Sequence, residues 1–282
     1  MAQYKLFAFA DEAAASLDGQ IAAMKRNGLD GLELRFVDKE NVSAFSLEKA
    51  KSIKKEMDEA GLITWSIGSP IGKIDIEADD FEAHTELFKH TLEIANTVGA
   101  QNMRIFSFYI PQGKNPDDYK NEVIARLGRL AEIAKDSGVL LCHENEKGIY
   151  GDIASRCLEI LKAVPALRGV FDPANFVQCG ENTLSAWAML KPYTHYMHIK
   201  DSLRDGSIVP AGEGIGNIRA IASDFLASGG EVFTMEPHLK IFGGLDALER
   251  KGEDSAVEKA FVFGSNEEAF DAACAYFRKT ML

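Results

Sequence analysis

The sequence predicts a (β/α)8 barrel, in which parallel strands close into a cylinder inside a ring of helices, as a single domain over residues 1–282. Short apolar runs alternate with amphipathic helical patterns along the chain, and parallel strands need such crossovers. A helix–glycine–strand junction recurs at Gly28, Gly61, Gly99 and Gly138, at intervals of 33, 38 and 39 residues. This repeat matches one unit of a barrel that uses about 250 residues for eight units.

The strands are expected at eight apolar, β-rich runs: residues 4–9, 31–36, 62–67, 102–108, 139–144, 168–172, 194–199 and 231–236. An open, doubly wound sheet is the structural alternative, but no G-x-G-x-x-G pattern follows the first run. Residues 237–264 are predicted to be an insertion before the last helix, which either covers the barrel mouth or supports oligomer contacts.

The helices between these strands have recognisable start and stop signals. Ser46 is a predicted N-cap, followed by the apolar stripe Leu47, Ala50, Ile53 and Met57. Asn115 and Pro116 supply the cap and first residue of another helix. Each recurrent glycine falls where the end of a helix needs a left-handed residue. The helical pattern therefore supports the repeating unit.

Composition restricts the partners and the compartment. Lys plus Arg number 31 against 43 Asp plus Glu, a formal net charge of -12. An acidic surface repels phosphate backbones, so we expect no nucleic-acid partner. The four cysteines form no C-x-x-C pair, which favours reduced thiols and a cytoplasmic location. The N-terminus does not look like a signal peptide, and no apolar run reaches membrane-spanning length, so no membrane partner is expected.

Four potential metal ligands end four successive predicted strands: Glu144, Asp172, His198 and Glu236. Barrels of this kind place the active site at the carboxyl ends of their strands. Side chains two residues apart share a face of a strand, so the inward neighbours below the four are Cys142, Val170, Tyr196 and Thr234. One carboxylate at a strand end is more often solvated or a helix cap. The four together predict one divalent ion, Mn²⁺, Mg²⁺ or Co²⁺, with Zn²⁺ also compatible.

The residues around these positions resemble a known family. They are EN at 144–145, FDPAN at 171–175, HIKD at 198–201 and MEP at 235–237, and GLELR at 31–35 fits the same pattern. Together they resemble the xylose isomerase-like TIM barrels, which include sugar epimerases, hydroxypyruvate isomerase, inosose dehydratase and endonuclease IV. The resemblance implies that the four strand-end residues bind one divalent metal ion. It also implies that Glu144 and Glu236 act as acid and base.

Four further residues are predicted to contact the substrate: Glu146, Asn175, Lys200 and Arg204. Glu146 can return to the mouth just beyond its strand, and Lys200 has the same strand parity as His198. The ketose 3-epimerases of the family usually have a glutamate, a histidine and an arginine at the positions held here by Tyr150, Asn175 and Arg204. Only the arginine matches, so the sugar specificity of that subgroup is not implied.

Other residues are weaker candidates. The segment AGEGIGN, residues 211–217, precedes a helix after the seventh strand, where such barrels often bind phosphate, although glycine also simply makes turns. Arg35 and Arg104 lie on the second and fourth strands. Aromatic residues that either wall the pocket or belong to the core are Phe7, Trp65 and Phe106.

The leading hypothesis is a metal-dependent isomerase or epimerase of a sugar, sugar phosphate or sugar-derived keto acid. It would work through an enediolate, with Glu144 and Glu236 on different sides of the substrate. A lyase, either a dehydratase or a decarboxylase, could use the same enediolate on a polyol-derived keto substrate. An endonuclease IV-like phosphodiesterase would need more histidine ligands, and His84 and His90 fall inside a predicted helix. A non-catalytic sugar-binding relative would not need two opposed glutamates. The family resemblance alone suggests a homo-oligomer.

Overall fold

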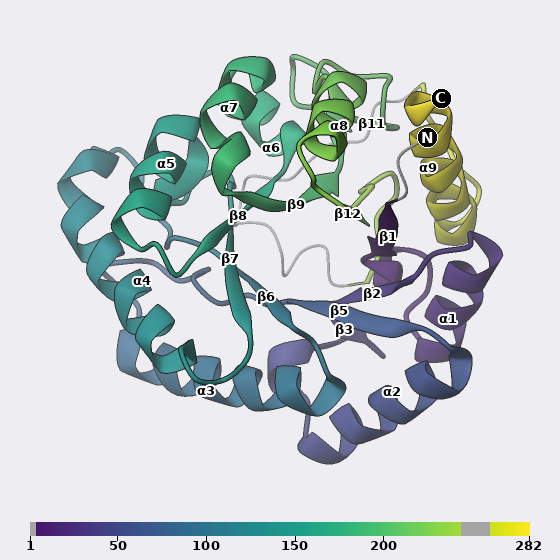
Figure 1. Cartoon of the computed structure of the whole chain (residues 1–282), viewed down its shortest axis with the longest axis horizontal. Helices are drawn as coiled ribbons and strands as arrows, with labels where there is room; N and C mark the ends of the chain where they lie inside the picture. The colour runs from purple at the N-terminus through teal and green to yellow at the C-terminus, as the bar shows by residue number, and fades with distance from the viewer. Residues whose placement is uncertain (1–3, 244–259) are drawn as a thin grey trace.

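A computed structural model describes residues 4–243 and 260–282. Parallel strands close into a barrel in the order β1-β12-β9-β8-β7-β6-β5-β2, and helices surround it (Figure 1). The barrel strands are β1 (Lys5–Ala8), β2 (Gly31–Leu34), β5 (Ile63–Gly68), β6 (Asn102–Ile105), β7 (Leu140–Glu144), β8 (Arg168–Phe171), β9 (Thr194–Ile199) and β12 (Val232–Met235). The predicted (β/α)8 barrel is confirmed, with a strand at each of the eight expected positions.

The helices run over the outside of the barrel (Figure 1). They are α1 (Leu17–Arg26), α2 (Leu47–Ala60), α3 (Phe81–Val98), α4 (Lys120–Ala134), α5 (Ala154–Ala163), α6 (Pro173–Gln178), α7 (Thr183–Leu190), α8 (Ile218–Ala227) and α9 (Asn266–Met281). Two short antiparallel ribbons stand apart from the barrel sheet: β3 (Phe36–Val37) with β4 (Glu40–Asn41), and β10 (Asp201–Ser202) with β11 (Ile208–Val209).

The predicted helix signals have the expected physical roles. The Ser46 hydroxyl accepts a hydrogen bond from the Lys49 N–H at 3.1 Å, which caps α2. Asn115 caps a 3-10 turn (Pro116–Tyr119) that leads directly into α4. Gly61 and Gly99 end α2 and α3 at φ 71° and 79°, a left-handed conformation that a side chain would make unfavourable.

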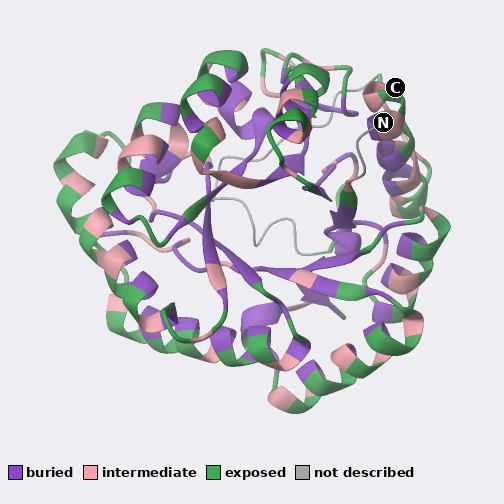
Figure 2. Ribbon diagram, in the orientation of Figure 1, coloured by how far each residue is buried: buried purple, intermediate pink, exposed green. Residues whose placement is uncertain are grey.

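Two apolar layers hold the barrel. The helices pack their buried faces on the outward side chains of the strands, and Figure 2 shows buried strands inside a ring of helices with exposed outer faces. Inside the barrel, away from its carboxyl end, lies a separate cluster that we call the lower barrel layer: Phe7, Cys142, Val170, Tyr196 and Val232, with Trp65 and Leu140 packed against it. Phe7 stacks on Trp65 with ring centroids 5.3 Å apart, so both belong to the core.

The fourth barrel strand differs from its prediction. It was expected over 102–108 but ends at Ile105, because the Phe106 and Phe108 N–H groups donate to the Ile71 and Gly72 carbonyls, outside the barrel ladder. Of the predicted insertion, residues 244–259 lie outside the described residues. All four cysteines are free thiols. Within 4–243 and 260–282, no helix combines the length and apolar character needed to span a membrane.

Candidate metal centre

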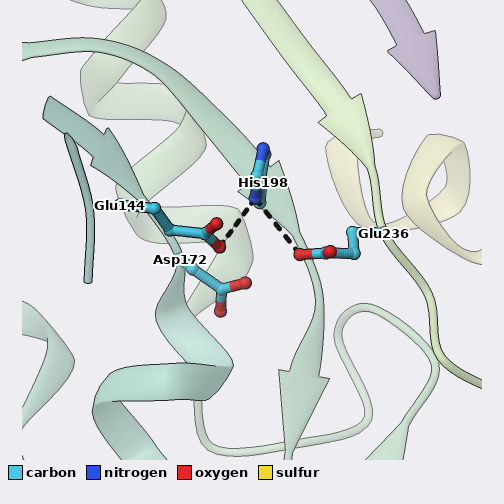
Figure 3. Close-up of side chains that lie close together, drawn as sticks. All are labelled: Glu144, Asp172, His198 and Glu236. Carbon is cyan, nitrogen blue, oxygen red and sulfur yellow. Dashed lines mark hydrogen bonds and ion pairs between the residues drawn. The ribbon is translucent and has the colours of Figure 1, made fainter. Parts of the chain in front are cut away.

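The four predicted ligands converge at the carboxyl end of the barrel. Glu144 is the last residue of β7, His198 lies in β9, and Asp172 and Glu236 directly follow β8 and β12. One potential ligand atom from each lies within 4.8 Å of the others, and all four side chains are buried. Figure 3 shows His198 between the two glutamates, with Asp172 beside them. We call these four residues the metal centre.

Asp172 divides its two oxygens between structure and site. Oδ1 accepts a hydrogen bond of 2.9 Å from the Asn175 N–H and caps α6. Oδ2 makes no hydrogen bond to the described residues but lies 3.0 Å from Lys200 Nζ. Burial raises the pKa of Asp172 to about 7 despite the opposing charge of Lys200. The oxygen that caps α6 and the oxygen that faces the centre are therefore different atoms of one carboxylate.

His198 presents different nitrogens to different carboxylates. Nδ1 lies 2.9 Å from Glu144 Oε1 and 3.1 Å from Glu236 Oε2, whereas Nε2 lies 3.1 Å from Glu33 Oε2. Burial acts to lower the pKa of His198, but the three carboxylates raise it well above its ordinary value. Nδ1 is therefore the nitrogen that faces the other metal-centre residues.

Two buried arginines hold the outer oxygens of the glutamates. Arg35 donates to Glu236 Oε1 at 2.9 Å, and an Arg104 nitrogen lies 3.2 Å from Glu144 Oε2. Both guanidinium groups lie over the Phe9 ring, 4.1 and 5.1 Å from its centroid. The sequence suggested these arginines only as weaker candidates, and the structure places both in direct contact with the predicted acid and base.

The charged environment keeps both glutamates ionised. Burial acts to raise the pKa of each carboxyl, but His198 and Arg104 bring Glu144 below its ordinary value. Lys200 and His198 bring the pKa of Glu236 well below its ordinary value. Glu236 Oε1 accepts a hydrogen bond from Arg35, whereas Glu144 Oε2 accepts none from the described residues. Glu144 therefore has the less occupied carboxylate oxygen.

The donor set fits a divalent cation. Carboxylate oxygens with one imidazole nitrogen suit Mg²⁺, Mn²⁺, Co²⁺ or Zn²⁺. Six buried carboxyl groups also gather around the centre beside three basic side chains, Arg35, Arg104 and Lys200; the six are Asp11, Glu12, Glu33, Glu144, Asp172 and Glu236. Buried charge is costly unless it is compensated, so a bound cation would stabilise this arrangement.

A second group of potential ligands, Glu12, Glu236 and His238, adjoins the centre. Arg35 donates to Glu12 Oε1 at 3.2 Å as well as to Glu236, and it supplies the positive charge here. The His238 backbone is left-handed, at φ 47°, and its N–H donates to Glu12 Oε2 at 2.7 Å. Burial raises the pKa of Glu12 to about 8. We therefore assign no second metal ion to this group.

The predicted substrate-binding residues have different surroundings. Lys200 Nζ is buried, 3.3 Å from Glu236 Oε2, and the Asn175 side-chain amide donates to Glu144 Oε1 at 3.4 Å. Glu146 is half-buried and pairs with Lys73 at 2.7 Å. Arg204 is exposed in the turn between β10 and β11. The structure thus brings Lys200 and Asn175 to the metal centre and places Arg204 in an exposed turn.

The glycine-rich segment 211–217 closes on a carboxylate of the chain itself. The N–H groups of Gly212, Gly214 and Gly216 donate to Asp201 at 2.9, 3.1 and 2.9 Å. A Cβ at Gly214 or Gly216 would lie 2.3 or 2.6 Å from Asp201 Oδ1, so the close approach requires glycine. These donors are already occupied, and the structure does not support the suggested phosphate site.

The other histidines have partners outside the metal centre. His84, His90, His143 and His195 contact, in turn, the Gly72 N–H, the Phe45 carbonyl, the Ser107 hydroxyl and the Asn102 side chain. His84 and His90 lie in α3, as predicted. The extra histidine ligands expected of an endonuclease IV-like metal cluster are therefore not found among these four residues.

The sequence analysis did not select Glu33, Asp11, Glu12 or His238. Glu33 could have been found, because it shares the inward face of its strand with Arg35 two residues later. Asp11 and Glu12 lie in a 3-10 turn (Ala10–Glu12) just beyond β1. The last residues of the strands in the second half of the chain do not point to this turn. No periodicity predicts the left-handed backbone that places His238 beside Glu12.

Comparison with known proteins identifies the family. A family model described as xylose isomerase-like TIM barrel matches residues 21–258, and the chain belongs to this family. The resemblance inferred from the motifs is thus confirmed. A search of curated proteins found no match.

Solved structures share the fold at low sequence identity. A D-allulose 3-epimerase from Methylomonas sp. aligns with a TM-score of 0.75 at 15% identity, over 99% of each chain. The IOLI protein with a zinc atom aligns at 0.72 and 16%, over 98% of each chain. The probable 3-DHS dehydratase AsbF from Bacillus anthracis aligns at 0.72 and 17%, also over 98% of each chain. Since an epimerase and a probable dehydratase share the fold, the fold does not determine the reaction.

Proposed function

We propose that the protein is a divalent-metal-dependent isomerase or epimerase of a sugar, sugar phosphate or sugar-derived keto acid. The supporting observation is the pair Glu144 and Glu236, two buried and ionised carboxylates on either side of His198. Each turns one oxygen toward His198 and the other toward a guanidinium group. Binding a sugar without catalysis would not require two such opposed carboxylates.

We assign the metal ion to Glu144, Asp172, His198 and Glu236. When bound, it would stabilise the negative charge that develops on substrate oxygens while a carbon-bound proton is removed. Lys200 is buried beside Asp172 and Glu236 and would donate a hydrogen bond to a substrate oxygen there. These residues would hold the carbonyl and hydroxyl groups in one orientation.

The two glutamates would move the proton. Glu144 Oε2 pairs with Arg104 at 3.2 Å but accepts no hydrogen bond from the described residues, so we assign to it the role of taking a proton from carbon. Arg104 would keep this carboxylate charged until the substrate arrives. Glu236 would return a proton from the other side. Return to the opposite face of the same carbon gives epimerisation, and return to the neighbouring carbon gives aldose–ketose isomerisation.

The proposal is tested by hydrogen exchange in D2O with a panel of ketoses, keto acids and inososes, followed by NMR and mass spectrometry. The metal-loaded wild-type protein should exchange a carbon-bound hydrogen of at least one compound. For an epimerase, Glu144→Gln and Glu236→Gln should each still exchange the hydrogen of one epimer but should not interconvert the two. Each variant keeps one carboxylate, which can remove and return a proton on one face of the substrate but cannot deliver a proton to the opposite face.

Three results would change the assignment. Interconversion of epimers at the wild-type rate in both variants would exclude the two-glutamate mechanism. Loss of exchange for both epimers in both variants would favour an aldose–ketose shift or a lyase. A wild-type protein that exchanges no hydrogen in any compound of the panel would count against the proposed chemistry.

A lyase acting on a polyol-derived keto substrate is the second candidate. It is favoured by the residues at two positions where ketose 3-epimerases usually contact the sugar. The Tyr150 hydroxyl donates to Glu159 at 2.6 Å, and the Asn175 amide donates to the Asn145 carbonyl at 2.9 Å, so both side chains already have partners within the chain. The same panel separates the candidates, because a dehydratase would release water and form an unsaturated carbonyl product.

A further inference from the structure

We infer that Glu33 is a positioning residue that fixes the tautomer and the ring orientation of His198 as a metal ligand. This inference rests on the proposed metal centre and concerns a residue that does not itself face the metal. Glu33 is fully buried in β2, and its Oε2 lies 3.1 Å from His198 Nε2, on the opposite side of the ring from Glu144.

Glu33 is itself held by donors. Its Oε1 accepts hydrogen bonds from the Tyr196 hydroxyl at 2.7 Å and the Ser66 hydroxyl at 3.3 Å. Only Oε2 is then left for the imidazole. Oε1 is held by hydroxyl groups below the metal centre, and Oε2 meets the His198 nitrogen that faces away from Glu144 and Glu236. Glu33 is therefore placed to orient a ligand and not to be one.

The fold explains this placement. Tyr196 precedes His198 by two residues in β9, so the two side chains share the inward face of one strand. Ser66 is the register partner of Glu33 in β5, and the pairing of β2 with β5 shifts between Leu32 and Glu33. Such irregularities re-aim side chains near active sites. Here Glu33 points inward to meet both hydroxyl groups and His198.

Aromatic rings also restrict the His198 ring. Phe9 packs edge-on against the imidazole at 5.2 Å between centroids, and Tyr196 packs similarly at 5.5 Å. The imidazole is thus contacted by the Glu33 carboxylate at Nε2 and by two aromatic rings. The free-energy cost of orienting His198 is therefore met largely by the fold before a metal ion binds.

The chemical consequence concerns the proton on the ring. A neutral imidazole has one N–H group, and an ionised carboxylate can only accept a hydrogen bond. Glu33 therefore requires an N–H on Nε2, so Nδ1, which faces Glu144 and Glu236, is the nitrogen that would exchange its proton for a metal ion. A carboxylate behind a histidine ligand also makes the ligand more basic, and loss of such a partner typically weakens metal binding about 10–100-fold.

The test measures Mn²⁺ binding to the metal-free protein by calorimetry. Glu33→Gln keeps the size of the side chain and removes its charge, so the Kd should rise about 10–100-fold. Asp201→Asn is the matched control, since Asp201 is a buried carboxylate three residues from His198 that accepts backbone N–H groups instead of contacting the imidazole. Its Kd should change by less than about threefold, because the orientation of His198 is unaffected.

A second readout follows His198 directly. In wild-type protein loaded with Zn²⁺, which is diamagnetic, nitrogen NMR should show His198 protonated at Nε2 and not at Nδ1. The Nε2–H signal should shift in Glu33→Gln, where the charged acceptor is lost, and stay in place in Asp201→Asn. If Glu33→Gln does not fold, Tyr196→Phe removes one donor to Glu33 and should shift the Kd and the signal in the same direction by smaller amounts.

The possible results separate this inference from the proposed function. A wild-type protein that binds Mn²⁺, with an unchanged Kd in Glu33→Gln, overturns the role of Glu33 alone. Equal weakening in Glu33→Gln and Asp201→Asn also overturns it, because general loosening of the barrel would then explain both. A wild-type protein that binds no divalent ion overturns the metal centre together with the role of Glu33.

Discussion

The metal centre and the lower barrel layer use the same strands in opposite ways. Glu144, Asp172 and His198 lie two residues beyond Cys142, Val170 and Tyr196 on the same inward faces. The next inward-facing position toward the carboxyl end of each of these strands is thus a charged or ionisable side chain instead of one that packs in the core. The lower layer gains stability from burial, whereas the metal centre keeps carboxylates out of water at a cost. Along β7, β8 and β9, the residues that stabilise the barrel by packing therefore lie only two positions from the potential metal ligands.

Glu33 joins the two layers. It takes hydrogen bonds from Tyr196, a member of the lower barrel layer, and contacts His198 of the metal centre. A rigid packed layer can then orient a ligand above it, which supports a precise site more effectively than a loop would. This contrast between the layers leads to tests in which a substitution in one layer that spares the Tyr196–Glu33 contact should leave the other layer unchanged.

The largest effect should come from the glutamates. A positioned general base typically contributes about 10²–10⁴-fold to a rate, so Glu144→Gln and Glu236→Gln should each lower kcat by at least that factor. The unfolding midpoint of the metal-free variants should fall, because each change removes a charge partner of a buried guanidinium group, so kcat is compared at a temperature where all three proteins are folded. Steady-state kinetics and thermal unfolding check this. If kcat is unchanged in both variants, the layer that contains Glu144 and Glu236 does not carry out the proposed proton transfer.

The sequence predicted the positions of strands and of strand-end residues, because a single physical rule determines each of them. The pattern of apolar runs and glycine junctions placed the barrel strands, and reading their last residues found Glu144, Asp172, His198 and Glu236. Both rules use local periodicity and the common polarity of parallel strands. They need no knowledge of which strands become neighbours.

The remaining site residues depend on contacts that periodicity does not specify. Arg35 and Arg104 could be placed on strands, but not paired with Glu236 and Glu144. Arg35 reaches from β2 to the end of β12, and Arg104 reaches from β6 to the neighbouring β7, and periodicity does not give the register between strands. Likewise, the segment 211–217 suggested a phosphate site from composition, and only the folded chain shows that the Asp201 carboxylate occupies its N–H groups.

The second prediction concerns the lower barrel layer. Phe7 is fully buried against Trp65, so Phe7→Ala should lower the free energy of unfolding by about 3–5 kcal/mol, from lost burial and the cavity left behind. Urea unfolding measures the change. Metal affinity at a temperature where the variant is folded should match that of the wild type. A large loss of affinity would show that the layers are not independent.

The third prediction uses a histidine outside both layers. His84 is buried in α3, and its Nε2 accepts a hydrogen bond from the Gly72 N–H at 2.8 Å, which only an unprotonated nitrogen can do. Burial lowers its pKa from 6.5 to about 4. The unfolded chain therefore binds the proton more readily. The stability due to neutral His84 is complete above pH 6.5 and is lost as the pH falls toward 4, by up to about 3 kcal/mol.

Urea unfolding of the metal-free protein at pH 7 and pH 4.5 provides the measurement. His84→Gln keeps an acceptor for the Gly72 N–H but does not titrate, so its stability should fall less between the two pH values than that of the wild type. Equal losses in the two proteins would mean that His84 is not held neutral. Comparing the two proteins cancels the titration of all other groups.

The fourth prediction concerns metal binding as a source of stability. A ligand that binds only the folded state stabilises it by about 2.7 kcal/mol when its concentration is 100 times Kd. Mn²⁺ should therefore raise the unfolding midpoint of the wild type. Asp172→Ala should abolish most of this gain and largely remove the metal found by elemental analysis after loading. A wild-type midpoint that does not respond to Mn²⁺, Mg²⁺, Co²⁺ or Zn²⁺ would count against the metal centre.

The smallest effect is expected for Arg204. The sequence predicted both Lys200 and Arg204 as substrate contacts, but Lys200 lies beside Asp172 and Glu236, whereas Arg204 is exposed in the turn between β10 and β11. An exposed charge is screened by water and ions, so Arg204→Ala should change kcat/KM by less than about threefold. Lys200→Met should cost at least about tenfold, because a buried hydrogen bond to a substrate oxygen would be lost. A large rise in KM for Arg204→Ala would show that the β10–β11 turn reaches the substrate. The boundary of the site would then extend beyond the metal centre, in the way that the match to the ketose 3-epimerase arginine predicts.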